Sequence, residues 1–427
     1  MMEVQQWKKQ LKEKVLGKID YGREMTDREV EDVIDEVMLQ EEAARMYPVR
    51  VRQRIRKELF DSLRRLDILQ MFVDDPSITE IMINGKDCLF VEREGRLEEL
   101  NMKFESTEKL QQVIQQIVAG CNRVVNEASP IVDARLENGA RVNIVMNPVA
   151  LDGPAVTIRR FPEKPITMEE LIRRHSLSKE AADFLKLLVQ ARYNIFISGG
   201  TGSGKTTMLN VLSGYVPDGE RVITIEDNAE LQLQGIRNLV RLEVRNSNVE
   251  GCREISIRDL IKTSLRMRPD RILVGEVRGA EAVDMIQAMN TGHEGSMSTG
   301  HANSARDMLA RLENMILMGM EIPLQAIRQQ IASGIDIIIH LGRLRDRSRR
   351  VLEIVDLAGC DGDQYMLNPL YTFEEIVEPE CDVHSSVAGE LQKKGDLVHG
   401  KKLQMAGIRY TPANNDRPQG KEESGQL

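Results

Sequence analysis

One stretch of the chain, Gly-Gly-Thr-Gly-Ser-Gly-Lys-Thr-Thr, has the residue types and spacing of a phosphate-binding loop. Glycines lack a Cβ, so consecutive backbone N–H groups can turn inward around phosphate oxygens at the positive end of a helix. The apolar run 195–197 precedes the stretch and the run 208–212 follows it, which predicts a strand, a turn and a helix. The predicted nucleotide-binding residues are Gly199, Gly200, Thr201, Gly202, Ser203, Gly204, Lys205, Thr206 and Thr207.

Two side chains of this loop carry specific chemistry. Lys205 is predicted to reach the β- and γ-phosphate oxygens of ATP, and the Thr206 hydroxyl is predicted to hold Mg²⁺. The alternative is a glycine-rich turn with an accidental lysine. The match to G-x-x-x-x-G-K-[ST] in a strand-to-helix context favours nucleotide binding.

Carboxylates end two further apolar runs, 221–226 and 271–276. Ligands of open α/β sheets bind at the carboxyl ends of the strands, which is where these side chains are expected. Glu276 is predicted to polarise the attacking water or to hold Mg²⁺ through water, and Glu230 is a second candidate. An isolated glutamate would be read as a helix cap or a solvated loop residue, but two such strands after a phosphate-binding loop favour catalysis.

Two of the six histidines, His293 and His301, lie in the polar, glycine-punctuated stretch 291–302. A lone histidine is more often structural than catalytic. Neither cysteines nor carboxylates stand at zinc-ligand spacing around them, so we expect phosphate sensing or the orientation of a catalytic group in place of metal binding.

The remaining sequence divides by its hydrophobic period. Residues 1–72 have helical spacing, with acidic and basic segments that we interpret as complementary faces of a small bundle, a partner-docking or lipid-facing surface being the alternative. Residues 73–161 have short strands with Asn-Gly turns and predict an independent α+β domain. The proline-containing segment 162–165 is the predicted linker, 166–375 the nucleotide domain, and 376–427 a tail expected to be disordered.

Arginines occur in two groups. Arg135, Arg141 and Arg159 lie near the end of the α+β domain. One interpretation is that they are ordinary surface residues, and the other is that they reach the γ-phosphate across an interdomain cleft. Five more arginines lie between the apolar runs 337–341 and 351–355. We interpret the segment that carries them as a charged hairpin tip in preference to a nucleic-acid contact. These arginines are Arg343, Arg345, Arg347, Arg349 and Arg350.

Composition narrows the class of protein. The 427 residues are 41% hydrophobic, which is enough for two or three globular domains. No stretch reaches the length of a membrane span and the N-terminus lacks a signal-peptide core, so we expect a cytoplasmic protein. A net charge of −9 argues against a protein that coats nucleic acid in general, and the five scattered cysteines indicate neither disulfides nor structural zinc.

The ordered segments GGTGSGKTT, ITIEDNAEL, RPDRILVGEVRG and TGHEGSMSTGHANS resemble the Walker A, Asp, Walker B and His boxes of the type II/type IV secretion ATPases. The earlier ITEIMINGKD, DARLENGARVNIV and VTIRRFP resemble the N-terminal domain of the CpaF branch, which serves Tad pili. This resemblance implies an α/β fold with a RecA-like core, preceded by a PAS-like domain and an N-terminal helical segment. It also implies active-site roles for Arg135, Arg141 and Arg159.

The same resemblance implies a function and partners. It implies a homohexameric ATPase motor that powers Tad-type pilus assembly or secretion through an inner-membrane platform protein, at the inner face of the cell membrane and without a span of its own. Nucleic acid is not an expected partner. Two alternatives stay open: an ATPase for conjugation or DNA transfer, and a nucleotide-gated switch without productive turnover.

Overall fold

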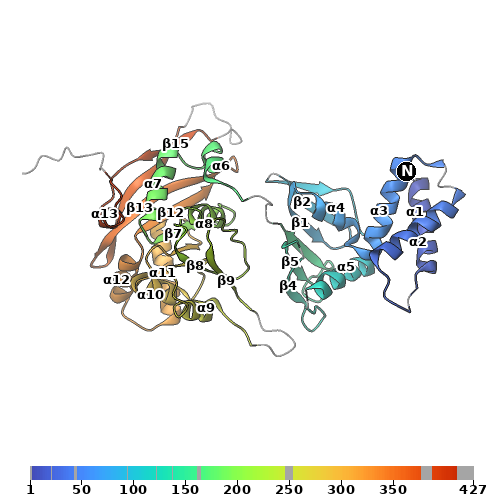
Figure 1. Ribbon diagram of the computed structural model, residues 1–427, viewed down its shortest axis with the longest axis horizontal. Helices are drawn as coiled ribbons and strands as arrows, with labels where there is room; N and C mark the ends of the chain where they lie inside the picture. The colour runs from blue at the N-terminus through green and yellow to red at the C-terminus, as the bar shows by residue number, and fades with distance from the viewer. Residues whose placement is uncertain are drawn as a thin grey trace, which may run out of the picture. The chain divides into compact units, whose positions relative to one another are not determined.

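The computed structural model describes residues 2–20, 22–42, 46–93, 95–121, 123–136, 138–160, 165–245, 253–376 and 387–410. The chain divides into two compact units, Met1–Glu163 and Lys164–Leu427, each described by itself below (Figure 1). The predicted linker at 162–165 lies, apart from Pro165, outside the described residues.

Unit 1 begins with three helices, α1 (Met2–Lys18), α2 (Asp27–Gln40) and α3 (Val49–Arg64). A capping box opens α2: the Glu29 N–H donates to Thr26 Oγ1 at 3.3 Å, and the Thr26 N–H donates to Glu29 Oε2 at 2.7 Å. The acidic face of α2 meets the basic face of α3, where Arg56 lies 2.5 Å from Asp35. The apolar faces form one core: Trp7, Leu11, Val15, Val30, Ile34, Val37, Met38, Ile55 and Leu59.

A short 3-10 helix, η2 (Asp67–Leu69), and helix α4 (Gln70–Asp74) lead into an antiparallel sheet. Its strands have the order β3-β2-β1-β6-β5-β4. Alternate residues point to opposite faces of a strand, and the buried ones, such as Val142 and Ile144, pack with helix α5. The bounds are β1 (Ile78–Asn84), β2 (Cys88–Arg93), β3 (Arg96–Leu100), α5 (Thr107–Gly120), β4 (Ile131–Arg135), β5 (Arg141–Val145) and β6 (Ala155–Arg159).

Unit 2 is built on a nine-stranded sheet with the order β15-β14-β13-β12-β7-β11-β10-β8-β9. The six strands from β12 to β9 in this order are parallel, and β13 to β15 extend the sheet antiparallel. The bounds of the strands are β7 (Ile195–Gly199), β8 (Arg221–Glu226), β9 (Asn238–Glu243), β10 (Arg271–Val274), β11 (Met297–Gly300), β12 (Ile337–Arg343), β13 (Arg349–Asp361), β14 (Gln364–Glu375) and β15 (Gly389–Lys393).

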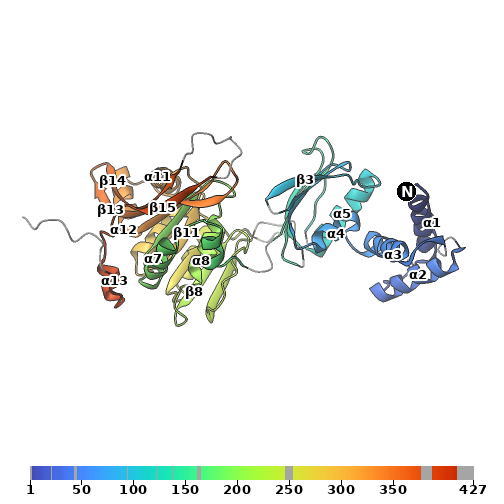
Figure 2. The same cartoon turned by 90° about the horizontal axis from the view of Figure 1, so that it is seen from above.

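Helices cover both faces of this sheet (Figures 1 and 2). Ile195 and Ile197 of β7 join the core formed with α7 and α8, whereas Phe196 between them joins the core formed with α10, α11 and α12. Burial on both faces explains the continuous apolar runs of the sequence. The helices are α6 (Met168–Arg173), α7 (Lys179–Gln190), α8 (Lys205–Ser213), α9 (Ile257–Ser264), α10 (Ala282–Asn290), α11 (Ala305–Gly319), α12 (Leu324–Gly334) and α13 (Lys401–Met405).

The expectation of a disordered tail over 376–427 is wrong for residues 387–410. Strand β15 pairs with β14, and the Leu391, Leu397 and Leu403 side chains are buried in the core of unit 2. Burial of these three side chains offsets the conformational entropy lost on ordering a polar segment, which composition alone did not indicate. Residues 377–386 and 411–427 lie outside the described residues.

Candidate functional site

The predicted strand, turn and helix of the phosphate-binding loop are confirmed as β7, residues 200–204 and α8. A Cβ at Gly199 would collide with the Leu341 carbonyl oxygen, so only glycine fits there. Gly204 has φ +99°, a left-handed conformation that glycine adopts without strain, and it opens α8. Ser203 Oγ is buried in this turn without a hydrogen-bond partner among the described residues, as expected of a cradle built for a ligand.

Lys205 begins a line of polar contacts that runs along the carboxyl ends of the parallel strands. Its Nζ donates to the Gly200 carbonyl oxygen at 2.9 Å and lies 3.2 Å from Nδ1 of His301, which follows β11. Nε2 of His301 lies 2.8 Å from Oε1 of Glu276, which follows β10. The structure therefore brings Lys205, His301 and Glu276 together from three strands, as the sequence predicts.

The pKa shifts and the hydrogen-bonding capacity of these side chains indicate which nitrogen atom of His301 carries a proton. Burial is the main cause that lowers the pKa of His301; the charge of Glu276 raises it and the charge of Lys205 lowers it, and the net downward shift favours the neutral imidazole. An ammonium group can only donate, so Nδ1 of His301 accepts from Lys205, and Nε2 is then the nitrogen that carries the proton, on the side of Glu276. Burial also lowers the pKa of Lys205, partly offset by the charge of Glu276.

Arg278 extends the line to the end of β8, and sequence reasoning missed it. Its guanidinium lies 2.8 Å from Glu276 Oε2 and 3.7 Å from Asp227 Oδ2. The hydrogen bond to Glu276 is the main cause that raises the pKa of Arg278, and Asp227 and Glu230 add to it. Glu230 therefore lies within electrostatic reach of the same site. The only signal in the sequence was a cation two residues after the predicted catalytic glutamate.

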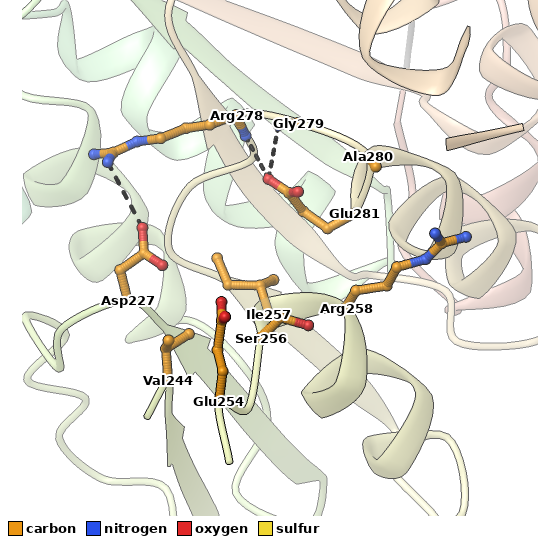
Figure 3. A pocket seen from close by; sticks show the side chains of 10 residues that line it. All are labelled: Asp227, Val244, Glu254, Ser256, Ile257, Arg258, Arg278, Gly279, Ala280 and Glu281. Atoms are coloured by element: carbon orange, nitrogen blue, oxygen red, sulfur yellow. Dashed lines mark hydrogen bonds and ion pairs between the residues drawn. The ribbon is translucent and has the colours of Figure 1, made fainter. Parts of the chain in front are cut away.

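A pocket of about 480 Å³ lies beside Asp227 and Arg278 (Figure 3). The backbone N–H groups of Arg278 and Gly279 donate to Glu281 Oε1 at 2.7 and 2.8 Å, which fixes the loop that carries Arg278. On its other side the pocket is lined by residues that open α9, among them Ser256 and Ile257.

Glu226, the last residue of β8, is the carboxylate at the end of the apolar run 221–226. Its side chain is only 3% exposed, and Oε2 accepts the backbone N–H groups of Glu230 at 2.7 Å and Leu231 at 2.9 Å. Burial raises the pKa of this carboxyl. Glu226 thus holds the loop on which Asp227 and Glu230 stand.

His293 does not lie with the other predicted site residues. It precedes β11, whereas His301 follows it, so the strand places the two histidines at opposite edges of the parallel sheet. Its Nδ1 lies 3.3 Å from the Ala288 carbonyl oxygen, and its own carbonyl accepts from Ser296 Oγ at 2.7 Å. Within this chain His293 therefore lies apart from Lys205, His301 and Glu276, and its catalytic role stays a prediction.

The three predicted arginines of unit 1 form a row across neighbouring strands. Arg135 of β4 lies opposite Arg141 of β5, and Arg141 lies opposite Arg159 of β6. Directly opposed residues of antiparallel strands share a face, and here it is the face turned away from the buried side chains of β5 and β6. In the sequence, Arg135 and Arg159 are separated by β5, a connection on either side of it and most of β6, and the sheet register brings them together.

A protein-family comparison matches residues 63–386 to the type II/IV secretion system protein family. The conjugal transfer protein TrbB of Rhizobium radiobacter is 31% identical over 77% of this chain and 98% of its own length. The type IV secretion system protein PtlH of Bordetella pertussis is 32% identical over 70% of this chain and 94% of its own. The chain belongs to the type II/IV secretion system protein family.

Solved structures agree at the level of fold. The pilus retraction motor PilT with bound ADP covers 80% of this chain and 88% of its own, with a TM-score of 0.51 and 21% identity. The ATPase DotB of Yersinia pseudotuberculosis has a TM-score of 0.51 and 19% identity over 68% of this chain and 78% of its own. These similarities confirm the predicted α/β fold class with a RecA-like core.

The helices that the structure describes include none with the length and apolar character needed to cross a membrane.

Proposed function

We propose that the chain binds ATP with Mg²⁺ at residues 199–207 and hydrolyses it. The observation that carries this proposal is the line Lys205, His301, Glu276, because it joins the phosphate-binding lysine to a carboxylate through a neutral histidine. The glycine-only turn and the buried, unpartnered Ser203 Oγ fit a polyphosphate ligand. A nucleotide-gated switch would need the loop but not the histidine and carboxylate behind it.

The residues have distinct roles in this proposal. Lys205 and the loop N–H groups bind the β- and γ-phosphates, and Thr206 supplies a hydroxyl to Mg²⁺, which when bound neutralises phosphate charge. Glu276 accepts a proton from the attacking water while the new oxygen–phosphorus bond forms and the bond to the β–γ bridging oxygen breaks. His301 orients Glu276, and Glu230 is the second candidate for the base.

The arginine row of unit 1 is proposed to stabilise the charge on the γ-phosphoryl group. Three guanidinium groups on one sheet face are a strong site for an anion, since the planar fork binds phosphate oxygens in pairs. The proposal requires unit 1 to close onto nucleotide bound by unit 2, within one chain or between neighbours of a homohexamer. ATP would then favour the closed arrangement over ADP.

At the level of the whole protein, we propose a hexameric motor of the cytoplasm that works on an inner-membrane platform protein. Its cargo is a Tad-type pilus or a secreted protein, as the resemblance to the CpaF branch indicates. The conjugal transfer relatives favour a second candidate, an ATPase for conjugation or DNA transfer. Loss of surface pili in a strain carrying Lys205→Ala would support the first candidate, and loss of plasmid transfer would support the second.

Single-turnover hydrolysis of ATP by the full chain tests the catalytic proposal. We expect Arg135→Gln, Arg141→Gln or Arg159→Gln to slow the chemical step, most strongly at the true contact, while the nucleotide Kd changes little. Arg96→Gln is the matched control, because Arg96 is an exposed arginine of the same sheet on the edge strand β3. Light scattering monitors assembly in parallel. Unchanged hydrolysis in all three variants would remove the arginine row from the mechanism.

A further inference from the structure

The arginine-rich hairpin between β12 and β13 stands directly beside the phosphate-binding loop. Strand β12 is the parallel neighbour of β7, and Leu341 lies opposite Gly199 in the register. Residues beyond Leu341 therefore continue past the carboxyl end of β7, where the loop begins. The sequence predicted only a charged hairpin tip, and the strand order shows that this tip lies next to the phosphate-binding loop.

Two residues of the hairpin, Arg345 and Asp346, tie it to the antiparallel end of the sheet. Arg345 forms an ion pair with Glu375 of β14. Asp346 accepts from Ser348 Oγ at 2.6 Å and from the Val387 N–H at 2.8 Å. These contacts hold the tip in one position relative to the sheet, and hence relative to the loop.

Arg350 adds to this attachment from the side of β13. Its guanidinium donates to the Val387 carbonyl oxygen at 2.7 Å and lies over the Phe373 ring at 5.2 Å from the centroid. Arg345 and Arg350 are thus accounted for by the structure of the hairpin itself.

Arg343 and Arg349 form a different kind of pair. They lie directly opposite each other in the antiparallel register, so their exposed side chains share one face of the hairpin. The planar fork of a guanidinium binds phosphate oxygens in pairs, so two guanidinium groups on one face can contact the same anion. The pair therefore has the character of an anion contact.

The arm of Arg349 reaches the phosphate-binding loop. A Cβ built on Gly204 would lie 3.9 Å from Arg349 Cδ, which is van der Waals distance, so the Arg349 side chain passes over the residue that opens α8. The guanidinium attached to Cδ can reach the positive helix end at which phosphate is predicted to bind.

We infer that Arg349, with Arg343 beside it, is a further nucleotide-binding residue that donates to phosphate oxygens of ATP or ADP bound in the loop of the same chain. This inference rests on the proposed nucleotide site. It adds a cation from the same unit as Lys205, in contrast to the arginine row of unit 1. A nucleic-acid strand on this hairpin is the competing use of the same charges.

Calorimetric titration of the full-length protein with Mg²⁺-ADP tests the inference. We expect Arg349→Gln to raise the Kd for ADP about tenfold and Arg343→Gln to raise it less, as for the loss of one charge-assisted hydrogen bond. Arg347→Gln is the matched control, since Arg347 lies at the hairpin turn with φ +65° and should leave the Kd within about twofold of the wild-type value. The melting temperature without nucleotide should be unchanged or higher in Arg349→Gln, and its rise on adding ADP should be smaller.

The outcomes separate this inference from the proposed function. If the wild type binds ADP, Lys205→Ala does not, and Arg349→Gln binds as the control does, only the role of Arg349 is overturned. If wild type and Lys205→Ala bind ADP alike, or neither binds it, the proposed site fails and the inference fails with it. Loss of single-stranded DNA binding in Arg349→Gln with ADP binding intact would assign the pair to nucleic acid and overturn the inference.

Discussion

The two edges of the parallel sheet in unit 2 both carry buried polar side chains, but they differ in how these are paired. At the amino-terminal edge, Arg271 is fully buried and donates to Glu220 and to the Val189 carbonyl oxygen. Asn194 donates to Gly334 O at 2.7 Å and accepts from the Gly295 N–H at 2.8 Å. This network holds loops together with groups that are already paired.

The carboxyl-terminal edge is organised in another way. Ser203 Oγ and Glu226 Oε1 are buried there without a hydrogen-bond partner among the residues described, and Lys205 is held only by a carbonyl oxygen and a histidine. Buried polar atoms are paired in the great majority of cases, so the exceptions need a reason. The comparison indicates that the edge whose buried polar groups are paired has a structural role, whereas the edge with unpaired buried polar atoms is suited to bind a ligand.

The largest contrast is expected between two lysines. Lys205→Ala should reduce ATP turnover by at least about 10³-fold, because the β- and γ-phosphate oxygens lose their cation. Lys402→Ala removes a lysine from the other edge, where its Nζ lies 2.7 Å from Asp336 Oδ2. It should lower the melting temperature but leave turnover per folded molecule unchanged. Steady-state phosphate release beside thermal unfolding measures both, and equal turnover in the two variants would break the comparison.

The buried arginine should show the reverse behaviour. Arg271→Met leaves Glu220 without its main partner in the interior, so we expect a loss of about 3–5 kcal/mol in the free energy of unfolding. The nucleotide Kd of the remaining folded protein should stay at its wild-type value. Denaturant unfolding followed with and without ADP measures the two quantities, and a weakened Kd without lost stability would show that this edge also serves binding.

A smaller effect distinguishes the two histidines. His301→Ala should lower the hydrolysis rate by about tenfold or more, because Glu276 loses its orienting donor. His293→Ala should leave the rate unchanged, since His293 lies at the other edge. Single-turnover rates of the two variants give the answer directly. An equal loss of rate in both variants would show that His293 also takes part in catalysis.

These histidines show what a sequence can and cannot predict. The phosphate-binding loop and the carboxylates at strand ends were predictable, because each depends on residues close together in the chain. Opposite positions for His293 and His301 depend on the four residues of β11 being one strand, and the stretch reads as a polar loop. Arg278 and the Arg343–Arg349 pair depend on sheet order and register. The ordered segment 387–410 depends on burial against a strand far earlier in the chain.

The smallest expected effect is a pH dependence. Burial lowers the pKa values of His301 and of His340, a buried residue of β12, so the unfolded chain binds more protons than the folded chain below about pH 6.5. These residues therefore make the free energy of unfolding fall as the pH falls from 7 to 5.5. His340→Asn should reduce that slope by less than about 1.4 kcal/mol per pH unit, the value for one proton. Urea unfolding of both proteins measures it, and identical slopes would contradict the shifted pKa of His340.

The central claim is that the carboxyl-terminal edge of the sheet hydrolyses ATP through Glu276. Its most direct test is a single-turnover assay in which radiolabelled ATP, bound by the full-length protein with Mg²⁺, is followed to phosphate in the wild type and in Glu276→Gln. We predict hydrolysis by the wild type, and in the variant an unchanged ATP Kd with a rate lower by about 10²-fold or more. A variant that hydrolyses ATP at the wild-type rate would contradict the claim.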